Sequence, residues 1–167
     1  MKILKSFKSV CILTKQYKSV GKKVGLVVGG FDVLHLGHIN LFRQAKRVVD
    51  ILFVGLDSDQ TLKLTKGENR PINNYYRRSQ FLSEITLVDH VFELNNFYIH
   101  GDKKSDQYFI NLYQKISPTH IFTHIDSDKL HSKRKDLAKR LGIKFVPDRT
   151  KYITTTSEIL SKIQSEI

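Results

Sequence analysis

Hydrophobic residues along this chain fall into short clusters of two kinds, and the two kinds alternate. Apolar runs at 24–28 and 51–56 have no polar break, which is typical of strands covered on both faces of a sheet. Between these runs, four apolar residues share one stripe at helical spacing: Ile39, Phe42, Ala45 and Val49. This spacing predicts a helix over residues 38–49.

The alternation continues to the end of the chain. We predict helices and strands in turn, at 75–86 (helix), 90–94 (strand), 107–116 (helix), 120–123 (strand), 132–141 (helix) and 143–146 (strand). A last helix begins near Thr155 or Thr156. Strands that alternate with helices form a parallel sheet with helices on both faces. The sequence therefore predicts an α/β fold, a Rossmann-like, doubly wound parallel sheet of five strands.

Two segments flank or interrupt this pattern. Ile3, Phe7, Val10 and Tyr17 recur at helical spacing and predict an amphipathic helix over residues 3–18. We therefore divide the chain into an N-terminal helix and lead-in, 1–23, and one α/β domain, 24–167. Residues 57–74 are polar, and a loop of that length is usually functional or mobile.

The composition narrows the class of protein. The chain has 167 residues and a net charge of +12 at pH 7, which attracts phosphate on a small molecule or along a nucleic acid. Seven lysines precede the first acidic residue, Asp32. Cys11 is the only cysteine, so no internal disulfide forms. No apolar run suits a membrane helix or a signal peptide, and we expect a cytoplasmic protein with no membrane partner.

The loop after the first strand holds the candidate chemistry. It reads Gly29-Gly30-Phe31-Asp32-Val33-Leu34-His35-Leu36-Gly37-His38 and opens a helix. Ligands bind at the carboxyl ends of parallel strands, and a helix N-terminus attracts phosphate. Gly29 and Gly30 let the backbone approach a triphosphate, and His35 and His38 can stabilise the charge that develops on an attacked α-phosphate.

The histidine pair has two other interpretations. A Zn²⁺ site requires a third ligand close by, and none is evident, so we expect no metal ligand cluster. The histidines also fit ordinary capping residues. Their position after a buried strand and behind Gly-Gly-Phe-Asp favours a catalytic role.

Gly30-Phe31-Asp32-x-x-His35-x-Gly37-His38 resembles the motif of the cytidylyltransferase-like nucleotidyltransferases. Three further segments resemble heptose 1-phosphate adenylyltransferases: Gly21–Val24, Val54–Asp59 and Lys66–Ile72. Near the end, Arg149-Thr150 and Ile153-Thr154-Thr155-Thr156-Ser157 are similar to glycerol-3-phosphate cytidylyltransferases. The resemblance covers most of the chain.

The resemblance implies a role for each matching residue. Catalysis is assigned to His35, His38 and Lys66. Nucleotide binding is assigned to Gly29, Gly30, Phe31, Asp32, His35, His38, Thr154, Thr155 and Thr156. Binding of the phosphorylated substrate is assigned to Asp32, Lys66, Arg78, Asp126 and Arg149. The resemblance also implies Mg²⁺ bound with the nucleoside triphosphate, and a homodimer.

One segment departs from the family pattern. After the fourth strand the relatives have glycine-containing runs, whereas this chain has Thr123-His124-Ile125-Asp126-Ser127 and keeps only Asp126. His124 and Ile125 would fill space that the family leaves free, which leaves open a base or an acceptor different from that of either relative. Gly30 also replaces a Cys or Thr.

Three functions remain open from the sequence. The first is an adenylyl- or cytidylyltransferase that acts on a sugar phosphate or polyol phosphate. The second is the same chemistry on flavin mononucleotide or a pyridine nucleotide. The third is a non-catalytic basic relative that binds nucleic acid, which the basic N-terminus favours and the intact motif residues oppose.

Overall fold

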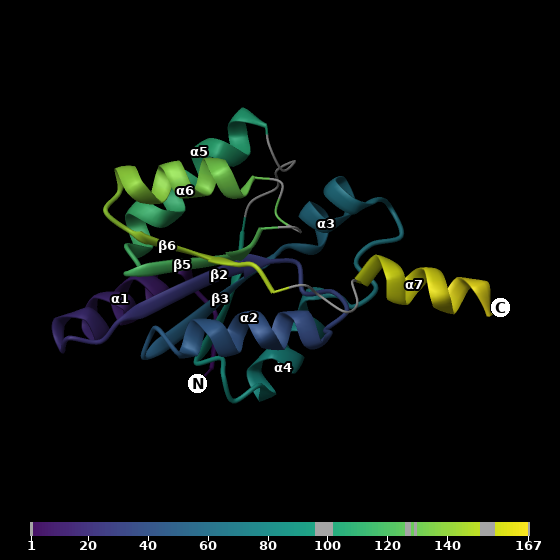
Figure 1. The fold of residues 1–167 in the computed structure, drawn as a ribbon, viewed down its shortest axis with the longest axis horizontal. Coiled ribbons are helices and arrows are strands. Elements are labelled where there is room, and N and C mark those ends of the chain that lie inside the picture. The colour runs from purple at the N-terminus through teal and green to yellow at the C-terminus, as the bar shows by residue number, and fades with distance from the viewer. Residues whose placement is uncertain (1, 96–101, 126–127, 129, 151–155, 167) are drawn as a thin grey trace.

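In the computed structural model, parallel strands form one sheet in the order β1-β4-β3-β2-β5-β6 (Figure 1). The structure describes residues 2–95, 102–125, 128, 130–150 and 156–166. The elements in chain order are β1 Ile3–Leu4, α1 Phe7–Ser19, β2 Val24–Gly29, α2 Leu36–Lys46, β3 Ile51–Asp57, α3 Asp59–Lys66, α4 Tyr75–Glu84, β4 His90–Leu94, α5 Lys103–Ile116, β5 His120–His124, α6 His131–Arg140, β6 Lys144–Asp148 and α7 Thr156–Ser165.

An apolar core lies on each face of the sheet. On one face, α1, α5 and α6 bury Val10, Leu112 and Leu137 against the strands. On the other face, α2 and α4 bury Phe42 and Leu82. Figure 1 shows these two helical layers, with α7 projecting beyond the carboxyl ends of the strands. The Rossmann-like α/β prediction is therefore confirmed.

The predicted count of five strands was wrong, because β1 adds a sixth at the edge of the sheet. Ile3 and Leu4 pair with Val91 and Phe92 of β4, inside the segment expected to be helical. The helix begins only at Phe7, since the Ser6 side chain accepts a hydrogen bond from the amide of Ser9 at 3.1 Å and caps it. A strand of two residues is too short to show a period in the sequence.

Residues 57–74 were expected to form a continuous loop, but the structure shows a helix within them. Their first half is helix α3, which starts because the Ser58 hydroxyl accepts from the Thr61 amide at 3.1 Å. Leu62 is fully buried and fixes the helix to the body of the protein. Gly67 ends α3 with a φ of 106°, a backbone conformation that favours glycine.

The other boundaries differ by smaller amounts. α5 begins at Lys103, ahead of the expected residue 107, because the Asp102 side chain accepts from the Ser105 amide at 2.6 Å. β5 and β6 end at His124 and Asp148, one and two residues beyond the prediction. No helix in the described part of the chain combines the length and apolar character needed to cross a membrane.

Deleting residues 1–18 is expected to destabilise the domain, because the removed segment covers its own sheet. Leu4 and Val10 are buried in the core, with Phe7 and Tyr17 packed against it. Burial of each large apolar side chain is worth about 2 kcal/mol, so the free energy of unfolding should fall by at least about 4 kcal/mol. Urea denaturation measures this loss, and size-exclusion chromatography tests the expected homodimer in the same samples.

The matched control for this truncation is the double variant Lys8→Ala/Lys15→Ala, which removes exposed charge from α1 and leaves its buried face intact. Its unfolding should match that of the wild type. A truncated protein with undiminished stability would contradict the packing of α1 and would favour a free basic tail.

Candidate active site at the histidine turn

The two motif histidines lie together where β2 passes into α2. His35 precedes the first residue of α2, and His38 stands in its first turn. Their rings stack with centroids 3.8 Å apart and planes inclined by 29°. The His35 amide donates to Nδ1 of His38 at 3.4 Å, so Nδ1 is an acceptor and the neutral His38 ring carries its proton on Nε2. The pair therefore presents an N–H donor at a helix N-terminus.

Both histidines favour the neutral form. Burial, together with positive charge on His35, Lys66 and His124, lowers the pKa of His38 to about 3. Burial also lowers the pKa of His35, with an opposing contribution from Glu158. Neutral rings can stack without like-charge repulsion, and each keeps one N–H donor. The uncharged pair can thus donate hydrogen bonds to phosphate oxygens at neutral pH.

A pH titration of stability tests the buried state of His38. Its pKa is about 3 in the folded protein and 6.5 in an unperturbed chain, so its stability contribution is complete above pH 6.5 and is lost as the pH falls toward 3. At about 1.4 kcal/mol per pH unit below pH 6.5, the wild type should lose about 2.5 kcal/mol more than His38→Gln between pH 7 and about pH 4.5. Urea denaturation at the two pH values measures this difference. Equal losses in the two proteins would place a solvated imidazole at residue 38.

The loop that leads to the histidines, residues 30–35 (the histidine loop), packs an aromatic ring on His38 and lies close to α3 at Gly30. Phe31 has a φ of 48° and sets its ring edge-to-face on His38, with centroids 5.0 Å apart. A Cβ on Gly30 would lie 2.7 Å from Cδ2 of Leu62 in α3. Gly30 therefore allows α3 to pack directly under the loop. Contact of Gly29, Gly30 and Phe31 with nucleotide stays a prediction.

The Asp32 carboxylate is bound by other groups of the protein, namely two backbone amides and an arginine. It is almost fully buried and accepts from the amides of Ile72 at 3.0 Å and Asn73 at 2.8 Å. Nε of Arg70 lies 3.0 Å from the same carboxylate. Asp32 thus ties the segment after α3 to the histidine loop. Its predicted contact with nucleotide or substrate is untested.

Arg78 was predicted to touch a phosphate, and the structure shows a different set of contacts. The side chain is fully buried on α4. Its guanidinium donates to the carbonyl oxygens of Asn73, Gly30 and Asp57 at 2.9, 2.6 and 2.8 Å, and to the Asp59 carboxylate at 2.7 Å. Arg78 therefore joins the histidine loop, β3 and the start of α3 through four of its five N–H donors.

Lys66 lies at the end of α3 with an exposed side chain. Crowding by protein atoms lowers the pKa of Lys66, the charge of Arg70 lowers it further, and Asp57 and Asp32 oppose the shift. Its charge also acts on His38. Of the three predicted catalytic side chains, His35 and His38 are therefore in direct contact, and Lys66 lies near enough for its charge to affect His38.

The C-terminal helix also reaches the histidine loop. Thr156, the first residue of α7, has its hydroxyl 3.4 Å from the carbonyl oxygen of Val33, to which it donates. Arg149 is exposed immediately after β6. The other predicted residues of these segments, Asp126, Thr154 and Thr155, lie outside the described residues.

Two residues near the histidines were missed as site residues. His124 was expected only to fill space; it is buried at the end of β5 and acts electrostatically on both His35 and His38. Glu158 on α7 acts on His35 in the opposite sense. The position of His124 at the carboxyl end of a strand next to β2 was the available signal.

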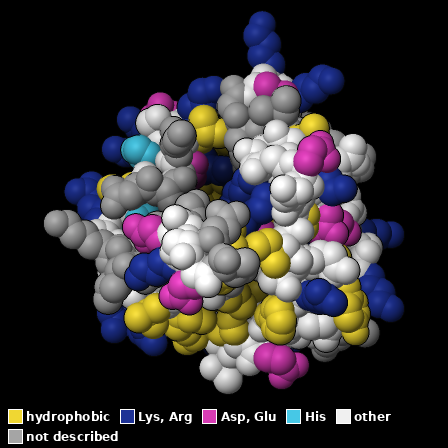
Figure 2. Space-filling model, turned by 90° about the vertical axis from the view of Figure 1, so that its right-hand side faces the viewer, with side chains coloured by type: hydrophobic (Ala, Val, Ile, Leu, Met, Phe, Trp, Pro, Cys, Tyr) yellow, Lys and Arg dark blue, Asp and Glu magenta, His cyan; other side chains and the backbone are white. Residues whose placement is uncertain are grey.

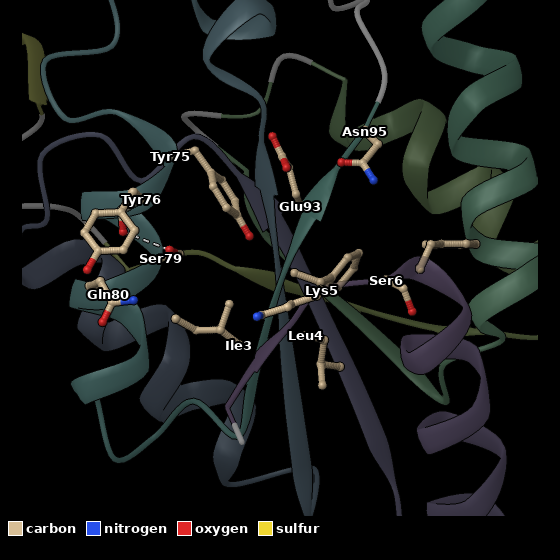
Figure 3. Close-up of a pocket in the computed structure, with 12 residues that line it drawn as sticks. Ile3, Leu4, Lys5, Ser6, Tyr75, Tyr76, Ser79, Gln80, Glu93 and Asn95 are labelled. Atoms are coloured by element: carbon tan, nitrogen blue, oxygen red, sulfur yellow. Dashed lines mark hydrogen bonds between the residues drawn. The ribbon is translucent and has the colours of Figure 1, made fainter.

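The carboxyl-end face of the sheet is shown in Figure 2, with a hollow near its centre bordered by Lys or Arg side chains. A separate pocket of about 490 Å³ lies at the sheet edge, between β1, the end of β4 and α4 (Figure 3). Tyr75 and Glu93 line it, and burial raises the pKa of both side chains, that of Tyr75 to about 12. No predicted catalytic residue lines this edge pocket, so the histidine turn remains the candidate active site.

A parallel α/β sheet with paired histidines at the start of a helix, a lysine beside them and a threonine-led C-terminal helix defines a nucleotidyltransferase domain. The chain belongs to the Cytidylyltransferase-like family, whose family model matches residues 26–164. The enzyme class expected from the sequence is thereby confirmed.

Comparison with curated proteins finds relatives named Bifunctional protein HldE. The protein from a Nitratiruptor species is 38% identical over 88 residues, which is 53% of this chain and 19% of the relative. The protein from Campylobacter jejuni subsp. jejuni serotype O:2 is 41% identical over 90 residues, 54% of this chain and 19% of the relative. The matched segment thus spans about a fifth of the length of these curated relatives.

Solved structures show the same fold. A lipopolysaccharide core biosynthesis protein from Thermoplasma volcanium superposes with a TM-score of 0.60 at 26% identity, over 79% of this chain and 99% of that chain. Pantoate-beta-alanine ligase from Francisella tularensis gives a TM-score of 0.67 at 18% identity, over 100% of this chain and 78% of that chain, and shows likeness of fold alone.

Proposed function

We propose that this domain transfers a nucleoside monophosphate from ATP or CTP to a sugar phosphate or polyol phosphate, most like a heptose 1-phosphate adenylyltransferase. The observation that carries the proposal is the stacked, neutral His35–His38 pair at the N-terminus of α2. An oxygen of the acceptor phosphate attacks the α-phosphorus and forms a new P–O bond. The bond to the oxygen that bridges the α- and β-phosphates breaks, and pyrophosphate leaves.

The histidines act by donating hydrogen bonds, with no covalent intermediate. Nε2–H of His38 and an N–H of His35 donate to phosphate oxygens as negative charge develops on the α-phosphate. The first amides of α2 and its dipole favour the same charge. Lys66 adds a positive charge from α3 and neutralises the leaving pyrophosphate. These groups stabilise the transition state more than the bound triphosphate.

The proposed acceptor contacts rest on Lys66, Asp126 and Arg149, with Arg78 and Asp32 holding the surrounding loops in place. Thr154, Thr155 and Thr156 at the start of α7 would bind the β- and γ-phosphates, because hydroxyls and free amides at a helix N-terminus attract anions. The support among described residues is the contact of Thr156 with Val33, which brings α7 to the histidine loop.

Mg²⁺ is proposed to arrive with the triphosphate. Among the described residues, no three His, Cys, Asp or Glu side chains converge on a point where they would hold a metal ion. The Asp32 carboxylate is already engaged by Ile72, Asn73 and Arg70. The ion would therefore take its ligands mainly from phosphate oxygens and water, and its charge would offset that of the triphosphate.

A pyrophosphate-release assay tests the proposal. The four nucleoside triphosphates are each combined with sugar phosphates, glycerol 3-phosphate, flavin mononucleotide and nicotinamide mononucleotide in the presence of Mg²⁺. Release of pyrophosphate that requires ATP or CTP together with a sugar or polyol phosphate supports the proposal. Activity only with flavin mononucleotide or nicotinamide mononucleotide would show that the acceptor is a flavin or pyridine nucleotide. If no combination of triphosphate and acceptor released pyrophosphate, the non-catalytic alternative would be favoured.

A further inference from the structure

His124 holds the chain at the carboxyl end of the sheet beside the histidine turn. It is the last residue of β5, which pairs with β2, and it lies two residues beyond the Val27–Phe122 pair of those strands. Its side chain is only 5% exposed. Because β5 and β2 run in parallel as neighbours, His124 lies at the edge of the sheet from which the chain continues from β2 to His35 and His38. A positive charge on His124 would lower the pKa of both histidines.

The His124 ring is bonded to the end of the neighbouring strand. Its Nε2 lies 2.7 Å from the carbonyl oxygen of Thr150. A carbonyl oxygen only accepts, so Nε2 carries the proton and the neutral ring has its acceptor at Nδ1. The amide of Thr150 donates to the buried Asp148 carboxylate at 2.9 Å, and the Ile125 amide donates to the Asp148 carbonyl at 3.1 Å. Both polar groups of the Thr150 backbone are thus engaged.

Thr150 and α7 are close in the sequence. Thr156 follows Thr150 by only six positions, so fixing Thr150 limits how far the start of α7 can move. Thr156 in turn contacts Val33 in the histidine loop, and Glu158, about half a turn further along α7, acts on His35. His124 therefore holds the segment that leads from β6 toward the N-terminus of α7, and Thr156 at that N-terminus contacts the histidine loop.

We propose that His124 is a positioning residue for triphosphate binding. Its Nε2–H bond to Thr150 holds the exit from β6, and thereby limits how far the N-terminus of α7 can move from the His35–His38 pair. This inference rests on the proposed function of the same site. It assigns to His124 an effect on the affinity for triphosphate, separate from the effect of His38 on turnover.

Two variants and one control test this role. His124→Ala removes the donor, whereas His124→Gln places an amide N–H near the position of Nε2. The control is His120→Gln, which changes an equally buried histidine at the other end of β5, bonded to Thr119. We expect His124→Ala to raise the triphosphate KM and the dissociation constant of a non-hydrolysable triphosphate about tenfold, because binding would then have to order the Thr150 segment that this hydrogen bond holds in place in the wild type.

The other expected results separate positioning from general instability. His124→Gln should recover most of the affinity, kcat should change by less than the KM in each variant, and His120→Gln should bind as the wild type does. Amide exchange without ligand should accelerate at Thr150 in His124→Ala alone. Faster exchange with unchanged affinity would overturn this assignment alone. A Gln variant as weak as the Ala variant would do the same, and a wild type that binds no triphosphate would overturn the proposed function with it.

Discussion

His38→Ala is expected to lower kcat by at least about a hundredfold while the affinity for triphosphate falls far less. Donors aimed at charge that develops in the transition state are worth about 3–4 kcal/mol each, and they act mainly after the substrate has bound. The His38 ring meets this description, because burial keeps it neutral with its proton on Nε2. Steady-state kinetics with saturating acceptor and a separate binding titration measure the two effects.

The comparison variant for His38 is His120→Gln, at the opposite end of the sheet, which should retain normal turnover. Thermal unfolding of His38→Ala shows whether the ring also supports the fold through its contact with Phe31. A variant with normal kcat and only a raised KM would show that His38 binds the ground state and would remove it from catalysis.

Lys66→Ala is expected to lower kcat/KM by about a hundredfold, since a charged hydrogen bond to phosphate contributes about 3 kcal/mol. The melting temperature should stay nearly unchanged, because the side chain is exposed at the end of α3. Lysine ordering has an entropic cost that only the bound triphosphate offsets. Kinetics and calorimetry measure the two quantities, and hydrogen exchange over residues 62–70 should slow when nucleotide binds.

Lys63→Ala provides the matched control for Lys66, because Lys63 is an exposed lysine on the same helix, one turn earlier. It should have near-normal kinetics. If Lys66→Ala behaved like Lys63→Ala and nucleotide gave no exchange protection, α3 would be an ordinary surface helix. The histidines would then carry the assignment alone.

Local signals made the centre of this site predictable from the sequence. A buried apolar strand, two glycines and two histidines three residues apart lie within one short stretch, so their proximity follows from chain connectivity. Short apolar runs likewise predicted β3, β4 and β5. They did not reveal β1 or α3, because β1 has two residues and α3 is held by a serine cap and one buried leucine, neither of which produces a visible period.

Long-range partners account for the rest of what the sequence did not show. Arg78 and Asp32 are recognisable as charged residues near the motif, but their partners lie up to 48 residues away. Nothing in the local pattern tells whether a buried arginine faces a ligand or three backbone carbonyls. The same holds for His124, whose bond to Thr150 joins the ends of two separate strands.

The contact between Gly30 and Leu62 makes two distant positions depend on each other. A side chain at residue 30 would overlap the leucine, whose Cδ2 lies 2.7 Å from the place of the missing Cβ. Where relatives have Cys or Thr at the first of these positions, the second must be smaller or turned away. A loop grafted from a relative with a side chain at this position would therefore require Leu62 to adopt another rotamer or to be replaced by a smaller residue.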